Sequence, residues 1–165
     1  MAFTIRPATR EDLPALVDIY NAGGVATTAS WDLERDTLRA REAWFDARRA
    51  QDFPVLVLDD DSGVQGYATY GTFREKAGFR STVEHTVYVR DGQRGSGGGE
   101  LLMNALIDYA RGRGVHVMVG ALDAANAASR RFHQRLGFIE VGLLPEVGRK
   151  FERWLDLLLV QRVLD

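Results

Sequence analysis

The chain contains no cysteine among its 165 residues, and its acidic and basic side chains almost cancel. The missing thiols exclude disulfides, thiolate catalysis and cysteine-ligated metal, and they fit a reducing cytosol. A formal net charge of −2 gives no reason to expect a nucleic-acid partner, because nucleic-acid binding needs a basic surface. No apolar run approaches the ~18 residues of a membrane span, and charges interrupt the N-terminal segment where a secretory signal would be apolar. We therefore expect a soluble cytoplasmic protein with no membrane partner.

The length and composition suit a single globular domain. Hydrophobic residues make up 45% of the chain and charged residues 27%, as in ordinary soluble proteins. A chain of this length buries roughly two-thirds of the surface of its unfolded state. No internal repeat, charge block or low-complexity linker divides the sequence. We therefore predict one domain over residues 1–165.

Apolar residues at helical or alternating spacing predict a mixed α/β fold. Helices are expected over residues 9–20, 34–50, 97–112 and 126–136. Strands are expected over residues 3–6, 55–58, 64–73, 81–89, 115–122, 138–144 and 154–164. The first helix should begin at the hydroxyl N-cap Thr9 and stop within residues 21–24. Strands and helices alternate in the second half, so we predict a mixed sheet with helices on both faces.

The most informative stretch is "QRGSGGGE", residues 93–100, in which glycine fills four of positions 95–99. It is not a nucleotide P-loop, because no lysine follows, and not a dinucleotide fingerprint, because Glu100 and Leu102 occupy the last glycine position. Its place between a strand and an amphipathic helix predicts an anion site, since glycine backbone can approach a ligand closely and a helix N-terminus favours anions by roughly 0.3–1 kcal/mol. Arg94 adds a cation, and a pyrophosphate fits this geometry. A tight packing turn and an interdomain linker are the alternatives.

The glycine turn carries a family resemblance. Residues 94–99, "RGSGGG", match the [QR]-x-x-G-x-[GA] signature of the GNAT superfamily of N-acetyltransferases, and residues 126–138, "NAASRRFHQRLGF", resemble that family's N-x-x-[AS]-x-x-x-Y-x-x-x-G-F helix. The stretches "STVEHTVYV" and "GRKFERWLDLLLVQ" resemble the phosphinothricin and methionine sulfoximine acetyltransferase branch, and the likeness runs along nearly the whole chain. The resemblance implies a central twisted, mostly antiparallel sheet flanked by helices, with acetyl-coenzyme A as cosubstrate. It also implies a homodimer.

The resemblance further implies which residues bind acetyl-coenzyme A. The backbone groups of Val87, Tyr88 and Val89 would pair with the pantetheine arm, and one N–H would act as an oxyanion donor. The turn would hold the pyrophosphate through Arg94, Gly95, Ser96, Gly97, Gly98 and Gly99. Asn126, Ser129 and His133 share one face of the last helix and would contact the coenzyme, whereas Ala125, Ala128, Phe132 and Leu136 would be core. Without the resemblance, Asn126 is an N-cap and Ser129 a first-turn polar residue.

Two residues are candidates for the chemistry. Glu84 would accept the proton of the attacking amine, because an ammonium has no lone pair with which to attack a thioester; the alternative is a solvated edge-strand glutamate. Glu84 lies three residues from Val87, about 10 Å along a strand, a distance that a bridging water can span. His133 stands where most of the family has a tyrosine assigned to protonate the departing thiolate, and histidine donates a proton more readily at neutral pH. The alternative for His133 is a coenzyme contact or a structural hydrogen bond. His85 should face away from Glu84 by strand alternation, and we interpret it as structural.

An amino-acid substrate also needs its carboxylate and side chain held. Arg74 is the first candidate for the carboxylate, because an arginine fork suits it. The other basic candidates are Arg80, Lys76 and Lys150. An apolar pocket would be walled by Phe73, Phe79 and Trp31. Solvated charges and core aromatics are the alternatives, and we predict no metal site.

The resemblance thus predicts an N-acetyltransferase that moves the acetyl group of acetyl-coenzyme A to the α-amino group of a small amino acid analogue. Phosphinothricin, methionine sulfoximine and methionine sulfone are the expected acceptors, and transfer would be direct, in a ternary complex. One alternative is the same chemistry on another amine: a peptide N-terminus, a polyamine or an aminoglycoside. The other is a non-catalytic acyl-coenzyme A-binding module.

Overall fold

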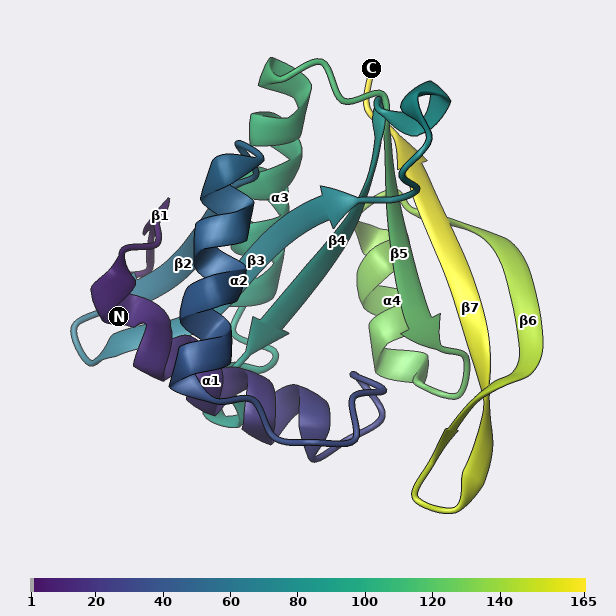
Figure 1. Cartoon of the computed structure of the whole chain (residues 1–165), viewed down its shortest axis with the longest axis horizontal. Helices are drawn as coiled ribbons and strands as arrows, with labels where there is room; N and C mark the ends of the chain where they lie inside the picture. The colour runs from purple at the N-terminus through teal and green to yellow at the C-terminus, as the bar shows by residue number, and fades with distance from the viewer. Residues whose placement is uncertain (1) are drawn as a thin grey trace.

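A computed structural model describes residues 2–165 and contains one seven-stranded sheet in the order β1-β2-β3-β4-β5-β7-β6 (Figure 1). The strands are β1 Thr4–Pro7, β2 Val55–Asp60, β3 Gly63–Thr72, β4 Thr82–Val89, β5 Val117–Asp123, β6 Ile139–Lys150 and β7 Arg153–Val163. Every neighbouring pair is antiparallel except β4 and β5, which run parallel. The expected mixed, mostly antiparallel sheet is therefore confirmed.

Helices cover both faces of this sheet. They are α1 Leu13–Tyr20, α2 Leu38–Ala50, α3 Gly98–Gly112 and α4 Ala127–Arg135. Figure 1 shows α1 and α2 on one face, with α3 and α4 on the other. Side chains alternate along β2 accordingly: Val55 and Val57 pack in the cluster with α1 and Phe45, whereas Leu56 and Leu58 pack with α3. Among residues 2–165, no helix is long and apolar enough to cross a membrane.

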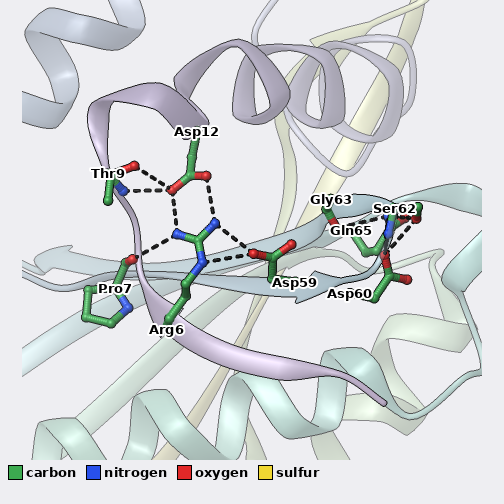
Figure 2. Close-up of polar contacts among 9 residues, drawn as sticks. All are labelled: Arg6, Pro7, Thr9, Asp12, Asp59, Asp60, Ser62, Gly63 and Gln65. Atoms are coloured by element: carbon green, nitrogen blue, oxygen red, sulfur yellow. Dashed lines mark hydrogen bonds and ion pairs between the residues drawn. The ribbon is translucent and has the colours of Figure 1, made fainter. Parts of the chain in front are cut away.

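The entry to α1 is fixed by a charged cluster (Figure 2). The guanidinium of Arg6, on β1, donates to both carboxylate oxygens of Asp12 at 2.8 and 2.9 Å and to Asp59 at 2.9 Å. The backbone N–H of Thr9 donates to Asp12 at 2.7 Å. These bonds to an ionised acceptor hold the pKa of Asp12 below its ordinary value and tie the first strand to the first helix.

Two predicted boundaries are wrong. Helical structure does not stop within residues 21–24. α1 ends at Tyr20, but a π-helical turn, Asn21–Val25, follows it directly, and the buried Asn21 side chain stabilises this turn by bonding the backbone N–H and C=O of Asp36. The second helix begins at Leu38 instead of residue 34. Thr37 is its N-cap, with its hydroxyl accepting from the N–H of Ala40, and such a cap sets the start of a helix.

The feature that positions the site is the separation of β4 from β5. Their pairing covers only Thr82–Glu84 against Val117–Val119. Beyond Glu84, β4 stays paired with β3 and β5 stays paired with β7, so the two central strands diverge (Figure 1). The edge of β4 from His85 onward is therefore left without a β5 partner.

Candidate active site

A cavity of about 610 Å³ lies where β4 and β5 separate. Its wall is formed by β4, the glycine turn before α3, the end of β5, helix α4 and the loop that follows α1. The lining includes residues 85–89, 93–95, 97, 99–100, 121–123, 126, 128–129, 131–133 and 135, with 23 and 27–29. Most of the residues expected to bind the coenzyme are thus brought together.

The glycine turn presents free backbone donors to this cavity. Gly95 and Gly97 have φ angles of +78° and +88°, which side chains disfavour, and Gly97 is the N-cap of α3. Within the described chain, the N–H groups of Gly95, Gly97, Gly99 and Glu100 have no acceptor, and the same four residues line the cavity. Four unpaired donors at a helix N-terminus, with Arg94 beside them, fit a diphosphate.

Two residues of the predicted turn have a different place. Gly98 is buried against β2, where an added Cβ would lie 2.5 Å from Cδ2 of Leu58, and it does not line the cavity. The Ser96 hydroxyl donates to the carbonyl oxygen of Gln93 and also lies outside the lining. The packing alternative therefore describes Gly98, whereas Gly95 and Gly97 have the open geometry of a ligand cradle.

The β4 edge and α4 complete the cavity. Val87, Tyr88 and Val89 line it, and in an antiparallel ladder alternate residues turn their N–H and C=O groups away from the paired strand. Asn126 caps α4, with its side-chain oxygen accepting from the N–H of Ser129 at 3.0 Å. Both residues also line the cavity, so a cap and a ligand contact do not exclude each other.

The expected division of α4 into a core face and a ligand face is only partly correct. Asn126, Ser129 and His133 line the cavity as expected, and Leu136 is buried in the core with Phe132 packed against it. The prediction is wrong for Ala125 and Ala128, which are exposed, because the cavity extends over the start of α4 and Ala128 lines it.

These features agree with comparisons to known proteins. Residues 15–138 match the model of the acetyltransferase (GNAT) family. The chain belongs to the GNAT family. This GNAT chain is 52% identical over 166 residues to an L-methionine sulfoximine/L-methionine sulfone acetyltransferase of Pseudomonas aeruginosa, covering 100% of the chain and 96% of the relative. It is 36% identical over 164 residues to a phosphinothricin N-acetyltransferase of Streptomyces coelicolor, covering 97% and 95%.

A solved structure of an acetyltransferase is also similar to this chain. The acetyltransferase yncA of Salmonella typhimurium, determined with its cofactor acetyl-CoA, has a TM-score of 0.95 and 45% identity, covering 100% of this chain and 95% of that one. The GNAT fold is thereby confirmed, and the protein is an acetyl-transferring enzyme.

In this GNAT enzyme, Glu84 lies on the β4 face opposite His85, as strand alternation predicted. Partial burial raises the pKa of its carboxyl, and the charge of Arg74 acts in the opposite direction. A raised pKa makes a carboxylate a better proton acceptor near neutral pH. Glu84 does not line the 610 Å³ cavity, so an acceptor amine would meet it from the other side of β4.

The other predicted substrate residues lie in the exposed segment before β4. Phe73 and Phe79 form an edge contact with centroids 5.9 Å apart, and the Arg74 guanidinium lies 5.3 Å from the centroid of Phe73. Arg80 is exposed in the same segment. None of these four residues lines the 610 Å³ cavity.

Lys150 and Trp31 have structural contacts instead. Lys150 is buried, and its Nζ donates to the carbonyl oxygens of Thr27 and Ser30 at 2.6 Å each and of Gly24 at 3.5 Å. The Trp31 ring packs against Gly148. Both residues therefore fasten the loop after α1 to the β6–β7 hairpin, which makes Lys150 unavailable for a substrate carboxylate.

Sequence analysis missed a residue at the cavity wall. His85 contacts His133 with 3.0 Å between their Nε2 atoms, although β4 and α4 are far apart in the sequence. The signal was present in the strand: His85 shares a face with Val87, which was expected to border the coenzyme.

Proposed function

We propose that this enzyme transfers the acetyl group of acetyl-coenzyme A to the α-amino group of a small amino acid analogue of the methionine sulfoximine, methionine sulfone or phosphinothricin type. The observation that carries the substrate class is the 52% identity, over the full length, with a relative of that name. We also propose that the enzyme works in the cytoplasm, which its lack of cysteine supports.

The geometry of the cavity supports the proposed coenzyme residues. Acetyl-coenzyme A supplies the acetyl thioester. The free N–H groups of Gly95, Gly97, Gly99 and Glu100 would bind its diphosphate, and Arg94 would add charge. The unpaired edge of β4 would hold the pantetheine arm, and one of its N–H groups would polarise the thioester carbonyl.

The acceptor would approach from the α1–α2 side of β4. Thr86 and Tyr88 share the face of Glu84 by alternation, and they line a second cavity of about 760 Å³ together with Tyr20 and Trp44. Thr86 is two strand residues from Glu84, a separation of about 7 Å. Glu84 can therefore take the proton of an amine bound beside Thr86, directly or through water.

The remaining roles follow from the position of each group. Arg74, whose charge already acts on Glu84, would hold the substrate carboxylate. Phe73, Phe79 and Arg80 would border the substrate side chain. His133, at the wall of the coenzyme cavity, would protonate the departing thiolate.

The substrate class is tested by thiol release from acetyl-coenzyme A with a panel of amines. Methionine sulfoximine, methionine sulfone and phosphinothricin should each give kcat/KM at least about tenfold above spermidine or a tripeptide, because a site fitted to one acceptor discriminates by 1 kcal/mol or more. N-acetylmethionine sulfoximine, which has no free amine, is the matched blank. Faster acetylation of the tripeptide or of spermidine would overturn the proposed substrate class.

The β6–β7 hairpin supports a homodimer. It is the sheet edge and carries a group of exposed apolar side chains, among them Ile139 at 62% and Trp154 at 59% exposure. Several exposed apolar side chains on one sheet edge favour an interface, and we propose a second copy of the chain as its partner. Light scattering should give twice the 18.4 kDa chain mass, and the double variant Leu143→Glu/Trp154→Glu should give 18.4 kDa. Leu33→Glu, exposed elsewhere, is the control, and a monomeric wild type would contradict the proposal.

A further inference from the structure

The coenzyme cavity is bordered by a pair of buried histidines, of which the roles above use only one. His85 of β4 is 5% exposed and His133 of α4 is 3% exposed, and their Nε2 atoms are 3.0 Å apart. Gly120 of β5 leaves room for this contact, since a Cβ there would lie 2.7 Å from Cε1 of His85. Both rings line the cavity.

The hydrogen-bond partners of the two rings fix where their protons are. Nδ1 of His85 lies 3.0 Å from the carbonyl oxygen of Val119, and Nδ1 of His133 lies 2.8 Å from that of Ser129. A carbonyl oxygen only accepts, so both Nδ1 atoms carry hydrogen. If both rings were neutral, the lone pairs of their two Nε2 atoms would face and repel each other across 3.0 Å. One proton between the Nε2 atoms replaces that repulsion with an N–H···N bond and gives the pair a single positive charge.

The surroundings stabilise one positive charge. His133 lies in the last turn of α4, where the helix dipole favours a cation. The rings of Phe132 and Phe138 make T-shaped contacts with His133, with centroids 5.2 and 5.4 Å away, and hold its ring in place.

No ionised side chain of the described residues is hydrogen-bonded to either ring. Within residues 2–165, neither ring bonds a carboxylate. The charged side chains on the elements packed around the pair are engaged elsewhere or face away: Glu84 lies on the other face of β4, and Asp123 accepts from Thr28 and from a backbone N–H. The others are the Arg130–Glu140 ion pair, Arg162, which donates to the carbonyl oxygen of Leu136, and Arg131 and Arg135 of α4, which are exposed and line the same cavity.

A second proton is excluded. Burial and the charge of His133 lower the pKa of His85 to about 3, and burial also lowers the pKa of His133. Both shifts disfavour a second proton on the pair, whereas the facing geometry of the two Nε2 atoms favours the first proton.

We propose that His85 and His133 act as one acid, in which the proton shared by their Nε2 atoms neutralises the sulfur that leaves the acetyl thioester. His85 is a positioning residue, because it acts through His133. The inference rests on the proposed acetyl transfer.

The proton movements balance as follows. The substrate nitrogen bonds the carbonyl carbon while the C–S bond breaks and its electron pair stays on sulfur. Glu84 first accepts the ammonium proton of the entering substrate and releases it to solvent, and it then accepts the second proton that the nitrogen loses on becoming an amide. His133 passes the shared proton to sulfur, which leaves a free thiol and a neutral pair. The opposed lone pairs of the neutral pair favour recovery of a proton from solvent before the next turnover.

The pair is tested first without catalysis, by long-range ¹H–¹⁵N NMR of the wild-type protein. The chain has only three histidines, and the exposed His116 serves as reference. Between about pH 5 and 8, His85 and His133 should both keep protonated Nδ1 and share one slowly exchanging Nε2 proton. A spectrum in which either ring has a bare Nδ1 would overturn the proposal, and this readout needs no variant to fold.

Kinetics of His85→Asn test the role of the pair, with His116→Asn as matched control. The kcat should fall by about 10- to 100-fold with little change in KM for acetyl-coenzyme A, as expected on loss of a general acid. The alkaline decline of wild-type kcat, where the pair loses its proton, should disappear. Unchanged kcat with that decline retained would show His85 to be merely structural. A shared proton seen by NMR in a protein that acetylates no amine would instead refute the proposed function, and with it the acid role.

Discussion

Replacing Glu84 with glutamine should lower kcat/KM for the amine by roughly 10²- to 10⁴-fold at neutral pH, the contribution usual for a general base. The amide keeps the size of the side chain but cannot accept the proton of an entering ammonium. Binding of acetyl-coenzyme A should be unchanged, because Glu84 faces away from the coenzyme cavity. Steady-state kinetics and calorimetry measure the two effects separately.

The pH dependence makes this test specific. The wild type should lose activity as the pH falls through the pKa of Glu84, which partial burial raises above its ordinary value. In Glu84→Gln, the remaining rate should instead be proportional to the fraction of unprotonated amine. It should rise about tenfold per pH unit up to the amine pKa of about 8. Glu75→Gln, exposed in the preceding loop, is the matched control. Full activity of Glu84→Gln across this range would remove Glu84 from the mechanism.

Replacing Gly97 with proline should weaken acetyl-coenzyme A binding by about 100-fold. The substitution deletes one of the four free N–H donors and forbids the φ of +88°, because proline holds φ near −65°. A hydrogen bond to a charged group contributes roughly 1.5–3 kcal/mol, and displacement of the neighbouring donors adds to the loss. Calorimetric titration with acetyl-coenzyme A measures it.

Two comparisons separate this effect from a general loss of structure. Gly92→Ala should bind normally, since Gly92 has no positive φ and nothing within 4 Å of an added Cβ. Arg94→Ala should weaken the binding of acetyl-coenzyme A less than Gly97→Pro does, because the exposed guanidinium already pairs with Asp91 at 3.0 Å. Normal binding by a folded Gly97→Pro protein would rule out the turn as the diphosphate site.

The parts predicted well from sequence depend on local chemistry. The β-branched run of β4 and the apolar spacing of α3 are properties of consecutive residues, so their boundaries agree with the structure to within one or two positions. The glycine turn was found for the same reason. The separate roles of Gly97 and Gly98 were not predictable, because the burial of Gly98 depends on Leu58, which packs against it from another strand.

The parts that were missed depend on contacts between distant segments. The His85–His133 pair forms because β4 and β5 diverge and α4 packs beside them. Neither arrangement can be predicted from the residues next to either histidine. The π-helical turn after α1 depends in the same way on the bonds of Asn21 to Asp36. Strand alternation gave the direction of His85 correctly but not its neighbour.

The ammonium of Lys150 fixes the position of the loop that borders the acceptor cavity. It joins three carbonyl oxygens of residues 24–30 to the end of β6, so the segment beside the acceptor cavity is anchored at a buried point and does not swing as a gate. Selectivity among amino acids then depends on the fixed contour of this wall. A change in the hairpin that moves Lys150 would reshape this wall, and it would also shift Thr27, which lines the coenzyme cavity.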